Sequence, residues 1–201
     1  MRLADPGRIC NVVVPQVRSL LVRPDASHFI TDGRYAEQVK AEVQGATVHV
    51  PGYALMDYVA QRGLLDGADT VLFQAEHITV STWERWLGVL AEFNVTAREN
   101  LLTRHVAQKS SDDLKIMRRA QAITEQVFED ILAFIRPGRS EREVAAEIVY
   151  RHLQLGADRM AFEPIVASGP RSALPHARPT TRVLEAGDLV VIDMGCVVEG
   201  Y

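Results

Sequence analysis

Two side chains near the end of the chain have the chemistry of an active site. Asp193 interrupts an apolar run at residues 189–194 that predicts a β-strand. If both faces of that strand are covered, the carboxylate is buried and must be neutralised, paired or bound to a cation. His176 lies in a loop between Pro175 and Pro179, which are expected to hold the chain extended. A neutral imidazole fixed in this way can transfer protons at about pH 7.

Each of these residues also has an ordinary structural explanation. Strand alternation places Leu189, Val191 and Asp193 on one face of the predicted strand. Asp193 could be a strand-end carboxylate held by backbone amides or an arginine, as well as a metal ligand. His176 could be a histidine of a surface loop. The other histidines show no partner spacing and are expected on the surface or in the core; they are at positions 28, 49, 77, 105 and 152.

Composition and charge exclude several classes of protein. Of 201 residues, 47% are hydrophobic and 24% are charged, which is enough apolar material for a sizeable core. The formal net charge is −4, so a general basic footprint for nucleic acid is absent. No apolar run approaches the roughly 20 residues that cross a bilayer, and the opening segment lacks the apolar stretch of a secretory signal. Cys10 and Cys196 lie too far apart to suggest a disulfide framework or a zinc pair. We expect a cytoplasmic protein without nucleic-acid or membrane partners.

The first half of the chain alternates between strand and helix signals. β-rich runs predict strands at residues 17–22, 28–31, 46–50 and 70–74. Helical spacing begins after Asp32, a candidate N-cap, and further helices are predicted at 53–63 and 81–93. The last helix should begin at Ser81 or Thr82 and carry one apolar stripe, formed by Trp83, Trp86, Leu87 and Leu90. This alternation predicts an α/β domain with a parallel or mixed sheet at residues 1–107.

Two strong helices open a second domain. The first is expected to be capped by Ser110 or Ser111 and to stop at Pro137. The second begins at a capping box made by Ser140 and Glu143. Residues expected to face the core from these helices are Leu114, Met117, Ala120, Val127, Ile131, Ile135, Val144, Ile148 and Leu153.

Strand signals follow these helices at residues 162–169 and 189–201. Two helices and two or three strands leave one face and one edge of a sheet uncovered. The sequence therefore predicts the incomplete start of an α+β domain at residues 108–201.

Residues 162–201 resemble the pita-bread metallopeptidases that act on Xaa-Pro peptides, aminopeptidase P and Xaa-Pro dipeptidase. The family pattern is a Pro-His loop, then a Gly-Asp pair, an Asp and a Gly on one strand, and a Gly-Tyr pair. In this chain these are Pro175, His176, Gly187, Asp188, Asp193, Gly195, Gly200 and Tyr201. Residues 20–38 are similar to the family's creatinase-like N-terminal domain. The resemblance implies an α/β creatinase-like N-terminal domain at 1–107, followed by the incomplete start of an α+β pita-bread catalytic domain at 108–201.

The resemblance also implies a reaction and a site. Asp193 would be the first of five metal ligands on a pair of divalent ions, Mn²⁺ above all, with Zn²⁺ or Co²⁺ as alternatives. His176 would be the catalytic residue that contacts the substrate and stabilises or protonates the intermediate. The substrate would be a peptide cleaved before proline, and the assembly a homodimer or larger homo-oligomer. Whether the enzyme is an aminopeptidase or a dipeptidase stays open.

The chain departs from the family pattern in three places. The Ser-Asp-x-Thr segment and the later ligands would lie beyond Tyr201, so we expect a truncated chain that is inactive alone and dimerises or aggregates through its exposed sheet edge. The family's first strand is not recognisable in residues 1–16, and Thr181 stands where an Asp is common. Two other interpretations remain: a non-enzymatic pita-bread module that binds peptides or proteins, and a metal-free creatinase-like hydrolase. Bound metal would separate the peptidase from both.

Overall fold

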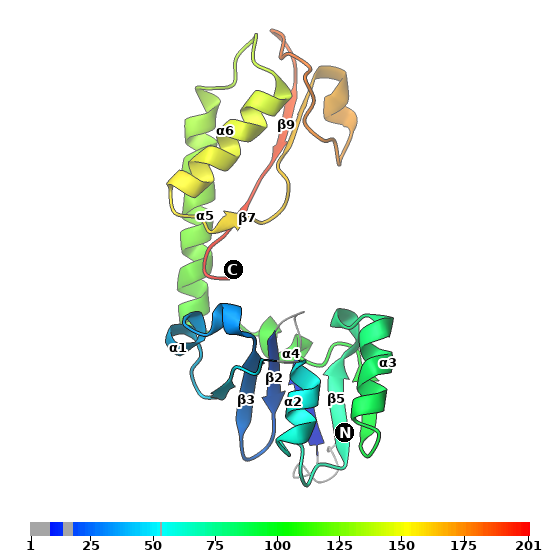
Figure 1. Cartoon of the computed structure of the whole chain (residues 1–201). Helices are drawn as coiled ribbons and strands as arrows, with labels where there is room; N and C mark the ends of the chain where they lie inside the picture. The colour runs from blue at the N-terminus through cyan, green and yellow to red at the C-terminus, as the bar shows by residue number, and fades with distance from the viewer. Residues whose placement is uncertain (1–8, 14–17, 53) are drawn as a thin grey trace. The chain divides into compact units, whose positions relative to one another are not determined.

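The computed structural model describes residues 9–13, 18–52 and 54–201. The chain divides into two compact units, Met1–Ala107 and Gln108–Tyr201 (Figure 1). None of the helices within the described residues is both long and apolar enough to cross a membrane.

The first unit is built on a mixed six-stranded sheet with the strand order β4-β3-β2-β1-β5-β6. The three strands β1, β2 and β3 form an antiparallel meander, while β4, β5 and β6 each run parallel to their neighbour. The strands are β1 (Ile9–Val13), β2 (Arg18–Val22), β3 (Ser27–Thr31), β4 (Thr47–His49), β5 (Thr70–Gln74) and β6 (Asn94–Arg98). The four predicted strands correspond to β2, β3, β4 and β5, whereas β1 and β6 were not predicted.

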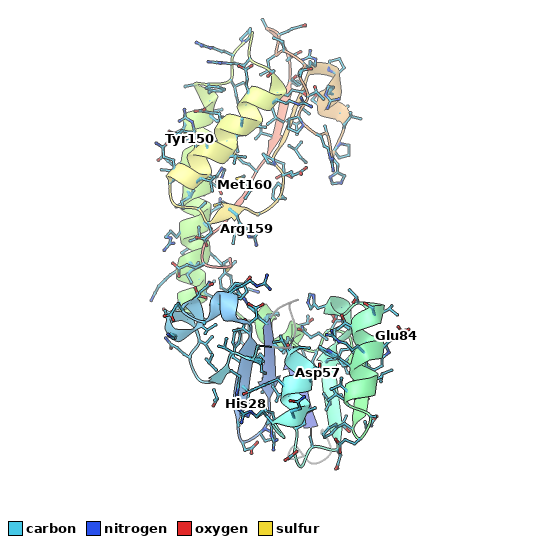
Figure 2. The ribbon with its side chains drawn as sticks, viewed as in Figure 1. His28, Asp57, Glu84, Tyr150, Arg159 and Met160 are labelled. Atoms are coloured by element: carbon cyan, nitrogen blue, oxygen red, sulfur yellow. The ribbon has the colours of Figure 1, made fainter. Side chains whose placement is uncertain are left out.

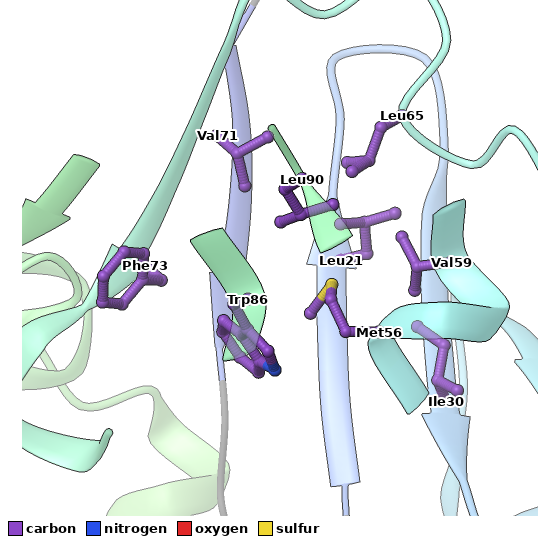
Figure 3. Packing of buried hydrophobic residues seen from close by; sticks show 9 residues of the cluster. All are labelled: Leu21, Ile30, Met56, Val59, Leu65, Val71, Phe73, Trp86 and Leu90. Atoms are coloured by element: carbon purple, nitrogen blue, oxygen red, sulfur yellow. The ribbon is translucent and has the colours of Figure 1, made fainter. Parts of the chain in front are cut away.

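Helices cover this sheet and close its core. They are α1 (Gln38–Glu42), α2 (Leu55–Gln61), α3 (Val80–Val89) and α4 (Thr103–Ala107), with 3-10 turns at Gly33–Tyr35 and Ala75–His77. Side chains from α2 and α3 meet those of the strands in one apolar cluster (Figure 3). Its members are Leu21, Ile30, Met56, Val59, Leu65, Val71, Phe73, Trp86 and Leu90.

Three details of the predicted helices in this unit differ from the structure. Asp32 is a cap, but it caps a 3-10 turn by accepting a hydrogen bond from the Arg34 amide, and α1 begins only at Gln38. Helix α3 is capped by Thr79, whose hydroxyl accepts from the Thr82 amide at 3.3 Å. On the predicted apolar stripe, Leu87 is 42% exposed.

The second unit contains the two predicted helices. They are α5 (Ser111–Leu132) and α6 (Glu141–Gln154), and each begins at a complete capping box. The Ser140–Glu143 box was predicted; at α5 the cap is Ser110, and its partner is Asp113. Both boxes satisfy backbone amides that a helix start leaves without an intrahelical partner.

Four short strands and a 3-10 turn complete this unit. Strands β8 (Ile165–Ser168) and β9 (Val190–Asp193) form one antiparallel pair, and β7 (Arg159–Met160) and β10 (Cys196–Val197) form another. The 3-10 turn Gly169–Ala173 follows β8 directly. The core of the second unit joins both helices to the β8–β9 pair. It consists of Val127, Ile131, Val144, Ala145, Ile148, Val166 and Leu184.

One face of the β8–β9 pair is covered and the other is open. Val190 and Ile192 pack against the core, as alternation requires. On the opposite face Leu189 is 78% exposed and Val191 is 40% exposed, which agrees with the sheet face that was expected to be uncovered. Three residues expected to face the core from the helices, Leu114, Met117 and Leu153, are likewise exposed.

Candidate active site

One hollow in the second unit brings the two predicted site residues together. It has a volume of about 360 Å³ and lies where β8 begins and β9 ends. Its lining consists of Phe162, Glu163, Pro164, Ile165, His176, Ala177, Arg178, Pro179 and Asp193. His176 and Asp193 come from separate segments, and the antiparallel pairing of β8 with β9 brings Asp193 opposite Ile165.

Asp193 is the last residue of β9 and is exposed on the open face. It lines a second hollow of about 310 Å³, which it shares with Gln121, Thr124, Glu125, Phe128, Glu129, Ile192 and Met194. Among the described residues, neither a backbone amide nor an arginine binds its carboxylate. The two explanations that left Asp193 as a structural carboxylate are therefore not supported by this geometry.

His176 lies in a tight turn, which corrects the extended loop expected from its flanking prolines. The Ala177 amide donates to the Leu174 carbonyl at 3.3 Å, so Pro175 and His176 are the two central residues of a β-turn. Proline suits this place because its fixed φ matches the first central position of common turns. The Ala177 side chain is buried and anchors the turn, while His176 is exposed to the hollow.

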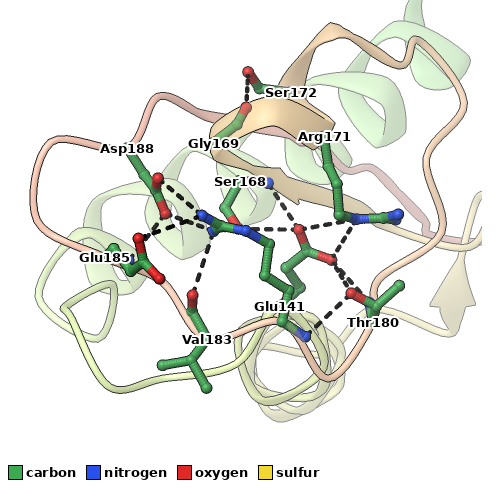
Figure 4. A network of polar contacts seen from close by, with 10 residues as sticks. Glu141, Ser168, Gly169, Arg171, Ser172, Thr180, Val183, Glu185 and Asp188 are labelled. Carbon is green, nitrogen blue, oxygen red and sulfur yellow. Dashed lines mark hydrogen bonds and ion pairs between the residues drawn. The ribbon is translucent and has the colours of Figure 1, made fainter.

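A buried carboxylate that was not predicted lies behind this turn. Glu141, the first residue of α6, is fully buried and accepts hydrogen bonds from Ser168, Arg171 and Thr180 (Figure 4). Burial alone would raise the pKa of Glu141, but the hydrogen bonds from Thr180 and Ser168 outweigh it and lower the pKa to about 2. No local signal distinguishes Glu141 from an exposed residue of a helix start, because its partners come from distant segments.

Arg182 extends this network towards β9. Its guanidinium donates to Asp188 at 2.6 and 3.1 Å and to the Ser168 hydroxyl at 2.6 Å. The hydrogen bond from Arg182, together with one from the Glu185 amide, holds the pKa of Asp188 below its usual range. Asp188, which belongs to the Gly-Asp pair of the sequence motif, is thus a structural residue at the entrance to β9.

Gly169 is required where this network approaches the backbone. Its φ is +52°, a conformation that favours glycine. An added Cβ would lie 2.6 Å from both Arg182 Nη2 and Asp188 Oδ1. A side chain at this position would therefore separate Arg182 from Asp188.

Three of the other histidines have partners of their own. His152 is buried in the core, where its Nδ1 lies 2.9 Å from the Ile148 carbonyl, as expected for a core residue. His28 on β3, which Figure 2 labels, does have a partner. Its Nδ1 lies 3.1 Å from Nε2 of His49, whose Nδ1 lies 3.0 Å from the Tyr58 hydroxyl. Burial, with His28 and Arg62 nearby, lowers the pKa of His49. The spacing of His28 and His49 in the sequence does not predict this contact, because it arises only when β3 pairs with β4 in parallel.

Asp193 is the candidate metal ligand that the sequence motif marks, and Glu163 and His176 line the same hollow. Within them, no group of three or more His, Cys, Asp or Glu side chains is placed to hold a metal ion. Asp193 fits as a single oxygen ligand because it is exposed, and oxygen ligands suit Mn²⁺ and similar hard ions.

Comparison with known proteins identifies similar chains. The model of metallopeptidase family M24 matches residues 115–201. The uncharacterized peptidase YqhT of Bacillus subtilis is 34% identical over 181 residues, which cover 90% of this chain and 51% of that protein.

Two solved structures are similar in fold. The Xaa-Pro dipeptidase from Bacillus anthracis matches with a TM-score of 0.87 at 29% identity, over 93% of this chain and 56% of that one. The X-Pro aminopeptidase from Thermotoga maritima matches with a TM-score of 0.82 at 29% identity, over 90% of this chain and 51% of that one. The chain thus spans about half the length of the relatives it matches.

Proposed function

We propose that the chain, whose residues 115–201 match the model of metallopeptidase family M24, serves the hydrolysis of the peptide bond that precedes proline. The observation that carries this proposal is the single hollow that contains both His176 and Asp193. In this proposal residues 1–107 form the creatinase-like N-terminal domain and residues 108–201 form the first part of the pita-bread catalytic domain.

Each residue of the hollow has a proposed task. Asp193 binds a metal ion through its exposed carboxylate, as one ligand of a centre that the described residues do not complete by themselves. When bound, a pair of divalent ions would polarise the scissile carbonyl and lower the pKa of an attacking water. His176 donates a hydrogen bond to the substrate carbonyl and stabilises the charge that develops on its oxygen.

The rest of the lining suits a proline-containing peptide. Phe162, Pro164 and Pro179 form an apolar wall that can pack against a pyrrolidine ring. Such a ring has no amide hydrogen to satisfy, so an apolar wall can accept it without leaving a polar group unpaired.

A chimera tests this proposal. Residues 1–201 are joined to the part of the Bacillus subtilis relative that lies beyond the matched segment, and hydrolysis of an Xaa-Pro peptide is measured with added Mn²⁺. We expect metal-dependent turnover that Asp193→Asn abolishes and that His176→Gln lowers by about 10²–10⁴-fold in kcat. Glu185→Gln, which changes an exposed carboxylate outside the hollow, should leave turnover unchanged. A folded chimera that binds Mn²⁺ but leaves Xaa-Pro peptides intact would contradict the proposed reaction.

A second candidate function concerns the 201 residues by themselves. Within the described residues no group of three or more His, Cys, Asp or Glu side chains is placed to hold a metal ion, so the chain alone is expected to bind an Xaa-Pro peptide in the hollow without cleaving it. Isothermal titration with a dipeptide, compared with the His176→Gln variant, tests this binding. Turnover by the 201-residue chain, with or without metal, would reject the binding-module interpretation, and metal-free turnover would favour a creatinase-like hydrolase.

We also infer self-association through the uncovered face of the β8–β9 pair. Leu189 and Val191 expose apolar area there that water solvates poorly. Light scattering should give a mass above that of one chain, and Val191→Lys should reduce it. A monomer at all concentrations would contradict this inference.

A further inference from the structure

We propose that Glu141 and Arg171 are positioning residues that fix the turn carrying His176 over the hollow. The role assigned to His176 rests on the proposed function, but the fixing of its turn is a separate property of this chain. Neither Glu141 nor Arg171 lines the hollow, so both act on it through the backbone.

Arg171 contacts the chain on both sides of His176. Its carbonyl accepts a hydrogen bond from the Leu174 amide at 3.0 Å, before the turn. Its guanidinium reaches across and donates from Nη2 to the Arg178 carbonyl at 2.7 Å, after the turn. One residue therefore closes the loop that presents His176, and its side chain sets the width of that loop.

Glu141 holds Arg171 and the far end of the loop at the same point. Its Oε2 accepts from Arg171 Nε at 3.1 Å and from the amide and hydroxyl of Thr180 at 2.9 and 2.7 Å. Its Oε1 accepts from the amide and hydroxyl of Ser168 at 2.8 and 3.0 Å. The carboxylate thus joins the end of β8 to both ends of the loop (Figure 4).

The anchor itself is rigid. Glu141 is the first residue of α6, whose start is fixed by the Ser140–Glu143 capping box. One turn further, Val144 and Ile148 are completely buried in the core. The Glu141 and Arg142 amides also donate to the Arg182 and Thr180 carbonyls at 3.0 Å each, so backbone and side chain hold the same segment.

The charge of Glu141 is essential to this arrangement. Both oxygens accept from donors, and the proposed chemistry uses neither of them. A glutamine would turn an NH₂ group towards either Ser168 or Thr180, where a donor would face a donor. Glu141→Gln therefore keeps the size of the side chain but releases one side of the loop.

The test uses the 201-residue chain uniformly labelled with ¹⁵N and ¹³C. His176 ring resonances are identified from their loss in His176→Gln, and amide exchange is followed at Ala177 and Thr180. In Glu141→Gln we expect the Thr180 amide to exchange at least about tenfold faster and the His176 ring resonances to shift or broaden. Arg171→Gln should change the His176 resonances while leaving Thr180 bonded to Glu141.

The matched control is Glu143→Ala, which removes the acceptor of the capping box at the same helix start. The control should lower the free energy of unfolding without changing the His176 resonances. If the role of Glu141 were merely structural, Glu141→Gln would behave in the same way. Unchanged His176 resonances in Glu141→Gln would overturn the proposal. If Glu141→Gln does not fold, Arg171→Gln decides: unchanged His176 resonances there overturn the proposal equally.

The same variants separate this inference from the proposed reaction. In the chimera, Glu141→Gln should lower kcat by about tenfold or more with little change in KM, because substrate binding by the apolar wall persists. If the His176 resonances change but turnover does not, the positioning of the turn stands and the catalytic role of His176 fails.

Discussion

The guanidinium of Arg182 and the carboxylate of Asp188 form a two-pronged ion pair, with Nη1–Oδ2 at 2.6 Å and Nη2–Oδ1 at 3.1 Å. The pair joins the segment that leaves the His176 loop to the segment that enters β9, which ends at Asp193. The relative placement of the two site residues thus depends on a contact that neither of them makes.

Asp188→Asn should destabilise the second unit. The substitution removes the charge that pairs with Arg182 and leaves that guanidinium, whose side chain is 23% exposed, with weaker partners. Urea unfolding monitored by circular dichroism should show a lower midpoint. The control is Asp193→Asn, an exposed carboxylate on the same strand segment, whose effect should stay within about 0.5 kcal/mol. Equal effects of the two substitutions would contradict the structural role of Asp188.

Stability should depend on pH through Glu141. The pKa of Glu141 in the folded chain is about 2, against 4.5 for an ordinary glutamate, so the folded state favours the charged form. The contribution is fully present above pH 4.5 and is lost as the pH falls towards about 2; at most it amounts to about 3 kcal/mol.

The free energy of unfolding of the wild type and of Glu141→Gln, measured from pH 2 to pH 6, isolates this term. The difference in free energy of unfolding between wild type and variant should shrink as the pH falls. Protonation of Glu141 in the wild type then removes the charge that the variant already lacks. A difference that stays constant over this range would show that the charge of Glu141 does not stabilise the fold.

Gly169→Ala should be strongly destabilising. Its positive φ costs a non-glycine residue about 1–2 kcal/mol, and the clash with Arg182 and Asp188 adds about 1–3 kcal/mol. Gly156→Ala is the matched control, since its φ is +93° but open space surrounds its added Cβ. The melting temperature of Gly169→Ala should be well below that of Gly156→Ala. The reverse order would exclude the close approach of Arg182 and Asp188 as the reason for a glycine at position 169.

Mn²⁺ should bind the 201-residue chain weakly. Within the described residues no group of three or more ligating side chains is placed to replace the ion's hydration shell, so we expect a Kd in the millimolar range or weaker. Paramagnetic broadening of resonances next to Asp193, such as those of Ile165 and Met194, measures the binding, and Asp193→Asn should abolish it. Tight binding of two ions would mean that the chain supplies further ligands.

Much of the second unit was determined by local sequence. A serine followed three residues later by an acidic residue can form a capping box from local sequence alone, so the starts of α5 and α6 could be predicted. Alternation along β9 predicted the faces of Val190, Ile192 and Asp193. The motif around Pro175 and His176 predicted the resemblance to the metallopeptidases, which the match of residues 115–201 to family M24 confirms.

Other features depended on tertiary structure. Whether a strand face is buried depends on what covers it, and alternation cannot tell a covered face from an open one; the side of Asp193 is open. Thr79 took the cap of α3 because the helix begins one turn earlier than its apolar stripe suggests. Strands β1 and β6 became strands by pairing with β5, a contact between segments far apart in sequence.

Glu141 shows the physical reason for this division most clearly. Its sequence neighbours mark a helix start, where acidic residues are common and usually solvated. Its burial and its low pKa come from Ser168, Arg171 and Thr180, which reach it only after β8 and the His176 loop fold against α6. The sequence by itself determined which residues could do chemistry and which periods the helices and strands follow, because those are short-range properties. The tertiary structure alone decided which carboxylate is buried and which is free, because burial and hydrogen bonding depend on segments that meet only in the folded chain.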